Sequence, residues 1–335
     1  MAATDLDPGA PPGRTWSLPA VALHLAGRLG YFAVVVLAVY TLSFVLVYAL
    51  PSDPVALMLD RRSSGAGGST QAQIEALRQR YGLDHSLPAR YLDMLGQLVT
   101  GDLGTSFRSG TPVATVLAAV APNTLALAGT ALLIALPFSF LLALATSWHP
   151  GSTAHRLLVN VPPLVAAVPA FLLGLLLQQL FSFTLRWVPS TGGSGLVLPA
   201  IALALPVSAS LTAVLVRSLD DVLRSSFVEL LRARGLPWRR VYLAHVVRNA
   251  LLPFVTIAGL TVGGVLVGTV VTETVFARAG LGRLLVSSVE TQDAPVVMAI
   301  AVFAAVVFAG ANLLVDLLYP VLDPRLRHRI AGGRA

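Results

Sequence analysis

The sequence predicts an all-α membrane protein: a polytopic bundle of six transmembrane helices, with a small helical external domain between the first two. Of its 335 residues, 56% are hydrophobic and only 12% are charged, whereas soluble domains carry about 25% charged residues. The mean hydropathy of +0.78 agrees with this class. Six apolar runs each reach the ~20 residues that a helix needs to cross ~30 Å of hydrocarbon.

The six spans are expected at residues 31–50, 123–147, 157–183, 196–216, 250–271 and 295–318. Between and around them we expect a disordered cytoplasmic tail (1–15), an interfacial helix (16–30), an external helical region (51–122) and a cytoplasmic C-terminal tail (319–335), so that residues 123–318 form a five-span core. A cleaved signal peptide is the alternative for the first span. Its apolar part would be shorter and would end in an A-x-A-like site, so we favour a retained anchor.

The external region is the one long polar stretch of the chain. Tyr91, Leu95 and Leu98 fall on one helical face, and Ile74, Leu77 and Tyr81 fall on another, which predicts two amphipathic helices.

The distribution of arginine predicts the orientation. Short loops that stay in the cytoplasm are enriched in basic residues. If residues 217–249 face the cytoplasm, the cytoplasmic segments hold 14 arginines and the short external loops hold 3. Both termini are therefore expected inside, and the long polar region outside.

Residues 217–249 are the most informative segment, because seven of the 23 basic residues lie there. Ser226 and Glu229 fit a capping box that starts a short helix. Phe227, Leu230 and Leu231 share one face of that helix. Gly235 suits a left-handed turn that ends it, and Pro237 suits the first turn of the next helix. The expected structure is a helical hairpin. Either Glu229 serves only as a cap and Gly235 only as a turn, or the exposed apolar face fills a groove on a soluble partner.

The residues that are missing exclude several functions. All 23 basic residues are arginine. A phosphate-binding loop of the G-x-x-x-x-G-K-[ST] type needs a lysine, so the chain is not expected to be a P-loop ATPase. The chain has no cysteine, and its histidines show no zinc-ligand spacing, so we expect no metal site. The arginines lie beside spans and do not alternate with aromatics, which argues against nucleic-acid binding.

A membrane-embedded enzyme remains a weak alternative. Gly192-Gly193-Ser194-Gly195 matches the G-x-S-G of intramembrane serine proteases, but no later span contains a histidine that could act as its base. We read these residues as an external turn and expect no catalytic residue.

Two acids lie near the membrane zone. Glu273 is either a residue of the outer mouth or translocation path, or the partner of a nearby arginine (Arg278 or Arg283), and Asp316 lies near a span end. The fifth span also carries two small-residue pairs, Gly259 with Gly263 and Gly264 with Gly268, which favour close helix packing over substrate contact.

Two runs in and after the polar segment carry a resemblance to a known family. They read Arg232-Ala233-Arg234-Gly235-Leu236 and His245-Val246-Val247-Arg248-Asn249-Ala250-Leu251-Leu252-Pro253. They resemble the E-A-A-type loop of ABC importer permeases, and more narrowly the dipeptide/oligopeptide/nickel class, which reads close to R-A-K-G-L and then H-x-x-R-N-A-L-x-P. Glu229 matches the acid of the motif, whereas Leu230 and Leu231 stand where the motif has alanines.

Shorter matches in the same order extend the resemblance over nearly the whole chain after residue 30. They are Pro51-Ser52-Asp53-Pro54, Tyr81-Gly82-Leu83-Asp84, Gly101-Asp102-Leu103-Gly104-Thr105-Ser106, Pro122-Asn123-Thr124-Leu125, Glu273-Thr274-Val275-Phe276, Gly280-Leu281-Gly282-Arg283, Asn312-Leu313-Leu314-Val315-Asp316 and Asp323-Pro324-Arg325.

The resemblance implies a permease in a bacterial plasma (inner) membrane that pairs with a second homologous permease. It also implies two cytoplasmic ABC ATPase subunits, which bind ATP and magnesium, and an extracellular or periplasmic binding protein that delivers the cargo. No cofactor is expected on this chain itself. The ATPase-coupling residues implied are Glu229, Leu230, Leu231, Arg232, Ala233, Arg234, Gly235, Leu236 and Pro237.

The expected cargo is a di- or oligopeptide; nickel complexes, glutathione or another small solute remain open. An ion-coupled secondary transporter is the more distant alternative, and it is disfavoured because the spans carry no charge at the midplane.

Overall fold

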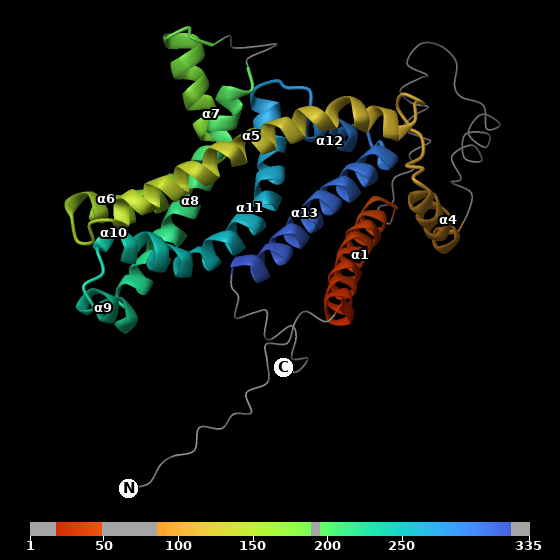
Figure 1. The fold of residues 1–335 in the computed structure, drawn as a ribbon. Coiled ribbons are helices and arrows are strands. Elements are labelled where there is room, and N and C mark those ends of the chain that lie inside the picture. The colour runs from red at the N-terminus through yellow and green to blue at the C-terminus, as the bar shows by residue number, and fades with distance from the viewer. Residues whose placement is uncertain (1–17, 49–85, 189–194, 323–335) are drawn as a thin grey trace, which may run out of the picture.

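The computed structural model describes residues 18–48, 86–188 and 195–322, and the regular elements of these residues are helices (Figure 1). Their order is α1 (Leu18–Tyr48), α4 (Leu87–Thr100), α5 (Val113–Ser147), α6 (Thr153–Ala166), α7 (Ala170–Gln178), the π-helical turn η1 (Gln179–Thr184), α8 (Val197–Leu223), α9 (Ser226–Ala233), α10 (Trp238–Arg240), the π-helical turn η2 (Val241–Val246), α11 (Val247–Val275), α12 (Leu281–Glu290) and α13 (Ala294–Leu322). The predicted N-terminal tail (1–15), the helical face of Ile74, Leu77 and Tyr81, and the turn at Gly192–Ser194 lie outside the described residues. Of the predicted C-terminal tail (319–335), residues 323–335 also lie outside them, and residues 319–322 continue α13.

Five helical rods in the described part are long and apolar enough to cross a membrane. They cover residues Ala26–Tyr48, Val113–Ser147, Val197–Leu223, Trp238–Val275 and Ala294–Leu317. These rods correspond to the first, second, fourth, fifth and sixth predicted spans. The fold class predicted from composition and run length is therefore confirmed.

The third predicted span is not one straight helix. Residues 157–183 belong to α6 and to α7 with η1, and these two pieces are bent by 95° at the break. Pro169 lies immediately before α7, and Pro162 and Pro163 lie inside α6. A proline lacks the amide N–H of a helical bond and restricts the residue before it, so the apolar run is interrupted although its length is sufficient. This segment is a sixth span only if the bent pair is counted as one.

Several helix ends also differ from the predicted span ends. α5 begins at Val113, ten residues before the predicted start, and runs through Pro122 and Pro137 for 35 residues, or about 52 Å. α8 continues to Leu223, beyond the predicted end at residue 216. α1 is one helix across residues 18–48, without a break between the predicted interfacial helix and the first span.

α8 lies at the centre of the bundle, between α5 and α11 (Figure 1). Glycines of α11 permit close approach on two sides. A Cβ on Gly263 would lie 2.6 Å from the Phe308 ring of α13, and one on Gly268 would lie 2.5 Å from Leu203 of α8. Gly259, Gly263 and Gly268 therefore serve packing within this chain, as the packing interpretation predicted, whereas Gly264 has open space around it.

α1 and α4 cover the other flank of α13. Tyr40, Phe44 and Tyr91 form an aromatic cluster between α1 and α4, with ring centroids 5.3 to 5.5 Å apart. At the opposite end of α1, Arg28 donates to Asp316 of α13 over 2.6 Å. The carboxylate near the end of the last span is thus paired inside the chain.

Candidate functional site

The segment between α8 and α11, residues 224–246, is called the polar hairpin below. It consists of α9, a turn, α10 and η2. Gly235 has φ +79°, which confirms the predicted left-handed turn after α9. The predicted capping box is wrong: Ser225, not Ser226, precedes the helix, and its hydroxyl donates to the carbonyl of Val222 instead of capping α9.

The short helix α9 has an inward and an outward apolar face. Val228 is 2% exposed, and Leu231 packs beside it against the core formed by α5, α8 and α11. Phe227 and Leu230 are 38% and 52% exposed. Leu231 therefore belongs to the inward face, and the outward apolar face is smaller than the sequence predicted because the hairpin uses part of it to hold itself to the bundle.

Aromatic side chains attach the hairpin to the end of α5. Tyr242 is fully buried, and its hydroxyl donates to the carbonyl oxygen of Leu144 over 2.9 Å. Its ring lies 5.0 Å from Trp148 and 5.6 Å from Trp238, and the guanidinium of Arg232 lies 5.5 Å from the Trp238 ring. Offset and edge contacts of this kind add about 0.5–1.5 kcal/mol each beyond burial.

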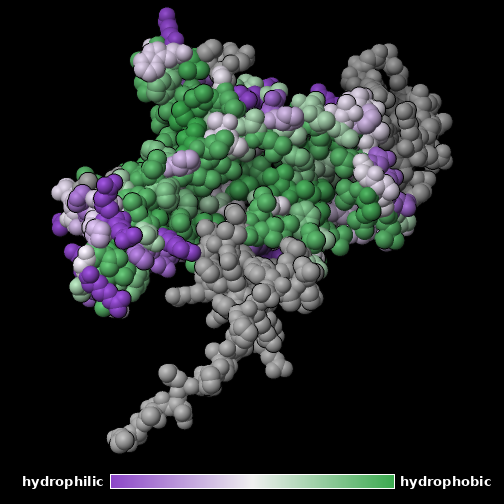
Figure 2. Space-filling model, in the orientation of Figure 1, coloured by the Kyte–Doolittle hydropathy of each residue, from purple (hydrophilic) through white to green (hydrophobic). Residues whose placement is uncertain are grey.

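The remaining predicted site residues cover the outer surface of the hairpin. The exposed ones are Glu229, Leu230, Arg232, Ala233, Arg234, Gly235 and Pro237, whereas Leu231 and Leu236 are half-buried. Arg224, Arg239 and Arg240 are exposed on the same segment. Figure 2 shows this end of the molecule as a hydrophilic patch beside the apolar surface of the bundle. The arrangement offers a partner a small apolar contact surrounded by positive charge.

Sequence reasoning missed the residues that hold the hairpin in place. Trp148, His155, Asp220 and Tyr242 come from three separate parts of the chain and meet at the base of the hairpin. No spacing rule links positions so far apart. The tryptophans next to the predicted span ends were the one available signal.

Glu273 is a residue of α11 and lies beside α5 at the end of that helix that is remote from the polar hairpin. It is 1% exposed, so in this structure it does not line an open mouth. Its carboxylate accepts the hydroxyl of Thr124 over 2.6 Å and the N–H groups of Gly282 and Arg283 over 2.8 and 3.3 Å. The carboxylate thus satisfies the first N–H groups of α12 and complements the positive end of its dipole. Glu273 contacts both nearby arginines through their backbones: its carboxylate accepts the N–H of Arg283, and its carbonyl accepts the N–H of Arg278 over 2.8 Å.

The residues around Glu273 explain why three of the short motifs have their composition. The Thr124 hydroxyl also accepts the N–H of Leu281 over 2.7 Å, and the Asn123 amide donates to the carbonyl of Ala279 over 2.7 Å. A Cβ on Gly280 would collide with the Glu273 carboxylate, and one on Gly282 would collide with the backbone of Val270. Glycine is needed here for the close approach of α5, α11 and α12.

A second buried carboxylate fixes the segment before α5. Asp293, 4% exposed, accepts the hydroxyl of Ser106 over 2.5 Å and the N–H groups of Phe107 and Arg108 over 2.9 and 3.4 Å. It joins the 101–112 loop to the start of α13.

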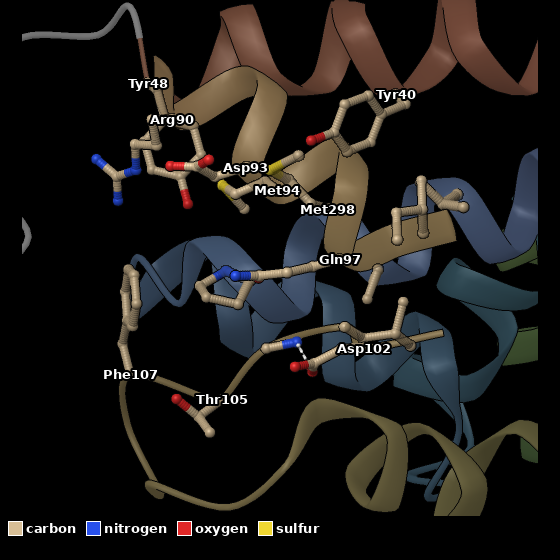
Figure 3. Close-up of a pocket in the computed structure, with 16 residues that line it drawn as sticks. Tyr40, Tyr48, Arg90, Asp93, Met94, Gln97, Asp102, Thr105, Phe107 and Met298 are labelled. Carbon is tan, nitrogen blue, oxygen red and sulfur yellow. Dashed lines mark hydrogen bonds between the residues drawn. The ribbon is translucent and has the colours of Figure 1, made fainter. Parts of the chain in front are cut away.

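A cavity of about 590 Å³ opens between α1, α4, the 101–107 segment and α13. Figure 3 shows Tyr48, Arg90 and Asp93 at one end and Asp102 with Thr105 on the opposite wall. Two of its polar side chains have partners: the Arg90 guanidinium lies 4.1 Å from the centre of the Tyr48 ring, and Asp102 accepts the N–H of Gly104 over 2.9 Å. No group of three or more possible metal ligands occurs among the described residues.

Comparison with known proteins places this architecture in a family. A family model described as "Binding-protein-dependent transport system inner membrane component" matches residues 135–328, and its N-terminal counterpart matches residues 23–128. The chain is 37% identical to the oligopeptide transport system permease protein AppB of Bacillus subtilis, over 88% of this chain and 96% of AppB. It is 36% identical to the glutathione transport system permease protein GsiC of Pectobacterium atrosepticum, over 88% of this chain and 95% of GsiC. The chain therefore belongs to the binding-protein-dependent inner-membrane permeases of ABC importers, multi-pass proteins of the bacterial plasma membrane.

Proposed function

We propose that the chain is the permease subunit of an ATP-driven importer for di- or oligopeptides delivered by an external binding protein. The names of the relatives support a peptidic cargo, since one group transports oligopeptides and another transports glutathione. Glutathione, nickel complexes or another small solute are the alternatives for the same architecture. The cargo class would be tested by uptake of labelled peptides of increasing length, with labelled glutathione as the competing substrate.

The proposed assembly pairs this chain with a second homologous permease and places two ATPase subunits beneath them. The chain has no lysine and hence no P-loop, so ATP and magnesium are bound by the ATPase subunits. Each permease would present one polar hairpin to one ATPase, and closure of the ATPase dimer would move the hairpins and, with them, the spans.

The observation that carries this proposal is the division of α9 into two faces. Val228 and Leu231 attach the helix to the bundle, and Phe227 and Leu230 remain exposed beside the arginines. A helix that presents anchors at i and i+3 suits insertion into an apolar groove of a partner. Because the inward face ties the helix to α5, α8 and α11, a force on the outward face reaches the spans.

Ion-coupled transport is less well supported. That mechanism uses intramembrane acids that bind and release the coupling ion. The two acids near the membrane zone already have partners within the chain. Glu273 accepts a backbone N–H at the start of α12, and Asp316 pairs with Arg28.

Docking is tested by replacing Leu230 with Ser and purifying the tagged chain with its cognate ATPase from native membranes. Loss of a central interface anchor costs about 1–2 kcal/mol, so the ATPase should bind roughly 5- to 30-fold more weakly. The matched control is Leu92→Ser on α4, which is 64% exposed and far from the hairpin. Equal recovery of the ATPase with both variants would refute docking at this surface.

The proposed orientation, with both termini in the cytoplasm, has a separate test. Because the chain has no cysteine, a single Arg239→Cys or Arg108→Cys change gives one reactive thiol at either end of the bundle. A membrane-impermeant maleimide added to intact cells should label position 108 and spare position 239. The reverse pattern would overturn the orientation and the cytoplasmic role of the hairpin together.

A further inference from the structure

His155 lies where three helices meet, near the base of the polar hairpin. Its backbone N–H donates to the hydroxyl of Ser152, which caps the start of α6. Its ring Nδ1 lies 3.2 Å from the carbonyl oxygen of Thr146 in α5, and its Nε2 lies 3.3 Å from Asp220 Oδ2 in α8. The side chains of His155 and Asp220 are only 12% and 20% exposed.

Both groups beside the His155 ring are hydrogen-bond acceptors. A carbonyl oxygen and a carboxylate accept hydrogen bonds and donate none, so the ring can donate an N–H to either of them. The hydrogen bond of the ring is to the Thr146 carbonyl, whereas Asp220 lies in close polar contact with Nε2 over 3.3 Å. Arg224 and Ser147 also lie beside the Asp220 carboxylate, so the cluster contains charges of both signs.

The position of Asp220 connects this cluster to the hairpin. Its carbonyl accepts the N–H of Arg224, the first residue of the hairpin, over 3.1 Å. On the other side, His155 opens α6, which leads through Pro162 and Pro163 to the 95° bend before α7. The His155–Asp220 contact therefore joins the root of the hairpin directly to the bent α6–α7 segment, across 65 residues of sequence.

A directional polar contact resists sliding between helices, whereas apolar contacts permit it. Apolar side chains of packed helices slide past one another by small shear movements. The His155 ring is tied to α5 by its hydrogen bond to the Thr146 carbonyl, which weakens steeply when its distance or angle changes. Because the same ring lies in polar contact with Asp220 of α8, it resists such sliding. Displacement of the end of α8 should then pull α6 with it.

We propose that His155 is a positioning residue that transmits movement of the polar hairpin to the α6–α7 segment during the transport cycle. The proposal rests on the proposed role of the hairpin as the ATPase docking site. It assigns a mechanical role to a contact that lies outside the 229–237 docking surface.

The test measures two movements in the purified complex of this chain with its partner permease and ATPase subunits. Because the chain contains no cysteine, spin-label pairs can be placed by single changes: Leu176→Cys on α7 or Arg239→Cys on the hairpin, each paired with Leu42→Cys on α1. Electron–electron double resonance then reports each distance with and without Mg²⁺ and a non-hydrolysable ATP analogue. Leu176 and Leu42 are 56% and 60% exposed, so both accept a label.

In the wild-type background, nucleotide should shift both distances. His155→Gln should keep the hairpin shift and lose the α7 shift, and His155→Arg, which supplies several N–H donors, should recover at least part of it. His149→Gln is the matched control, since His149 lies in the same turn but is exposed. It should leave both shifts unchanged.

Three results would overturn the proposal: an α7 shift that persists in His155→Gln, an α7 segment that does not move in the wild type, or loss of both shifts in His155→Gln, which would show a merely structural role. Failure of the underlying docking function is recognised separately. In that case the ATPase would be recovered equally with Leu230→Ser and with the wild type.

Discussion

Replacing the buried Glu273 by Gln should loosen the corner between α5, α11 and α12. The Gly282 and Arg283 N–H groups both donate to Oε2, and the Thr124 hydroxyl donates to Oε1. An amide keeps only one acceptor oxygen, so its NH₂ group replaces the acceptor of either the two backbone donors or the Thr124 hydroxyl. Hydrogen bonds to a charged group contribute about 1.5–3 kcal/mol each, and loss of the charge also removes the interaction with the α12 dipole. We therefore expect a destabilisation of about 3 kcal/mol.

The assay is thermal unfolding of the purified chain in detergent, followed by tryptophan fluorescence. For long domains a change of 1 kcal/mol shifts the midpoint by roughly 2 °C, so Glu273→Gln should unfold about 6 °C below the wild type. Glu290→Gln is the control, because Glu290 is exposed at the end of α12 that is opposite the Glu273 contacts. A midpoint for Glu273→Gln equal to that of Glu290→Gln would refute the reasoning and would return Glu273 to the list of candidate path residues.

Three further variants test other parts of the structure. Gly235→Leu places a side chain in the left-handed turn at a cost of about 1–2 kcal/mol, so ATPase docking and uptake should fall while the chain still inserts in the membrane; normal uptake would contradict the coupling role. Gly263→Leu should lower the melting midpoint because the side chain collides with Phe308, whereas Gly264→Leu, with open space around it, should not; equal midpoints would contradict the packing. Tyr242→Phe removes the hydrogen bond to the α5 carbonyl and should cost about 1 kcal/mol in the same unfolding assay; an unchanged midpoint would show that the stacked rings alone hold the hairpin.

The helices could be predicted from the sequence because their signals are local. The lengths of the apolar runs predicted five spans, and Gly235 with Pro237 two residues later predicted the turn. The face formed by Tyr91, Leu95 and Leu98 was also predicted correctly, since these residues pack together against α1. Each of these features depends on residues close together in the chain.

The features that were missed depend on distant residues or on direction. The length of an apolar run shows that it could cross a membrane, but not whether the helix is straight. The bend between α6 and α7 was therefore missed, although Pro162, Pro163 and Pro169 stand in the sequence. The burial of Glu273 depends on Thr124, 149 positions earlier in the chain. An exposed acid at a span end and a buried helix cap have the same local sequence, and only the fold distinguishes them.

The two ends of α5 are held by different kinds of contact, and this difference bears on which end moves. At the α12 end, the carboxylates of Glu273 and Asp293 bind backbone N–H groups, and Gly280 leaves no room for adjustment. At the hairpin end, the contacts come from side chains: the rings around Tyr242 can change rotamer without breaking a helix, and Tyr242 and His155 reach backbone carbonyls of α5. A force applied at the hairpin should therefore rearrange that end first, and the corner of α5, α11 and α12 should follow as one rigid unit.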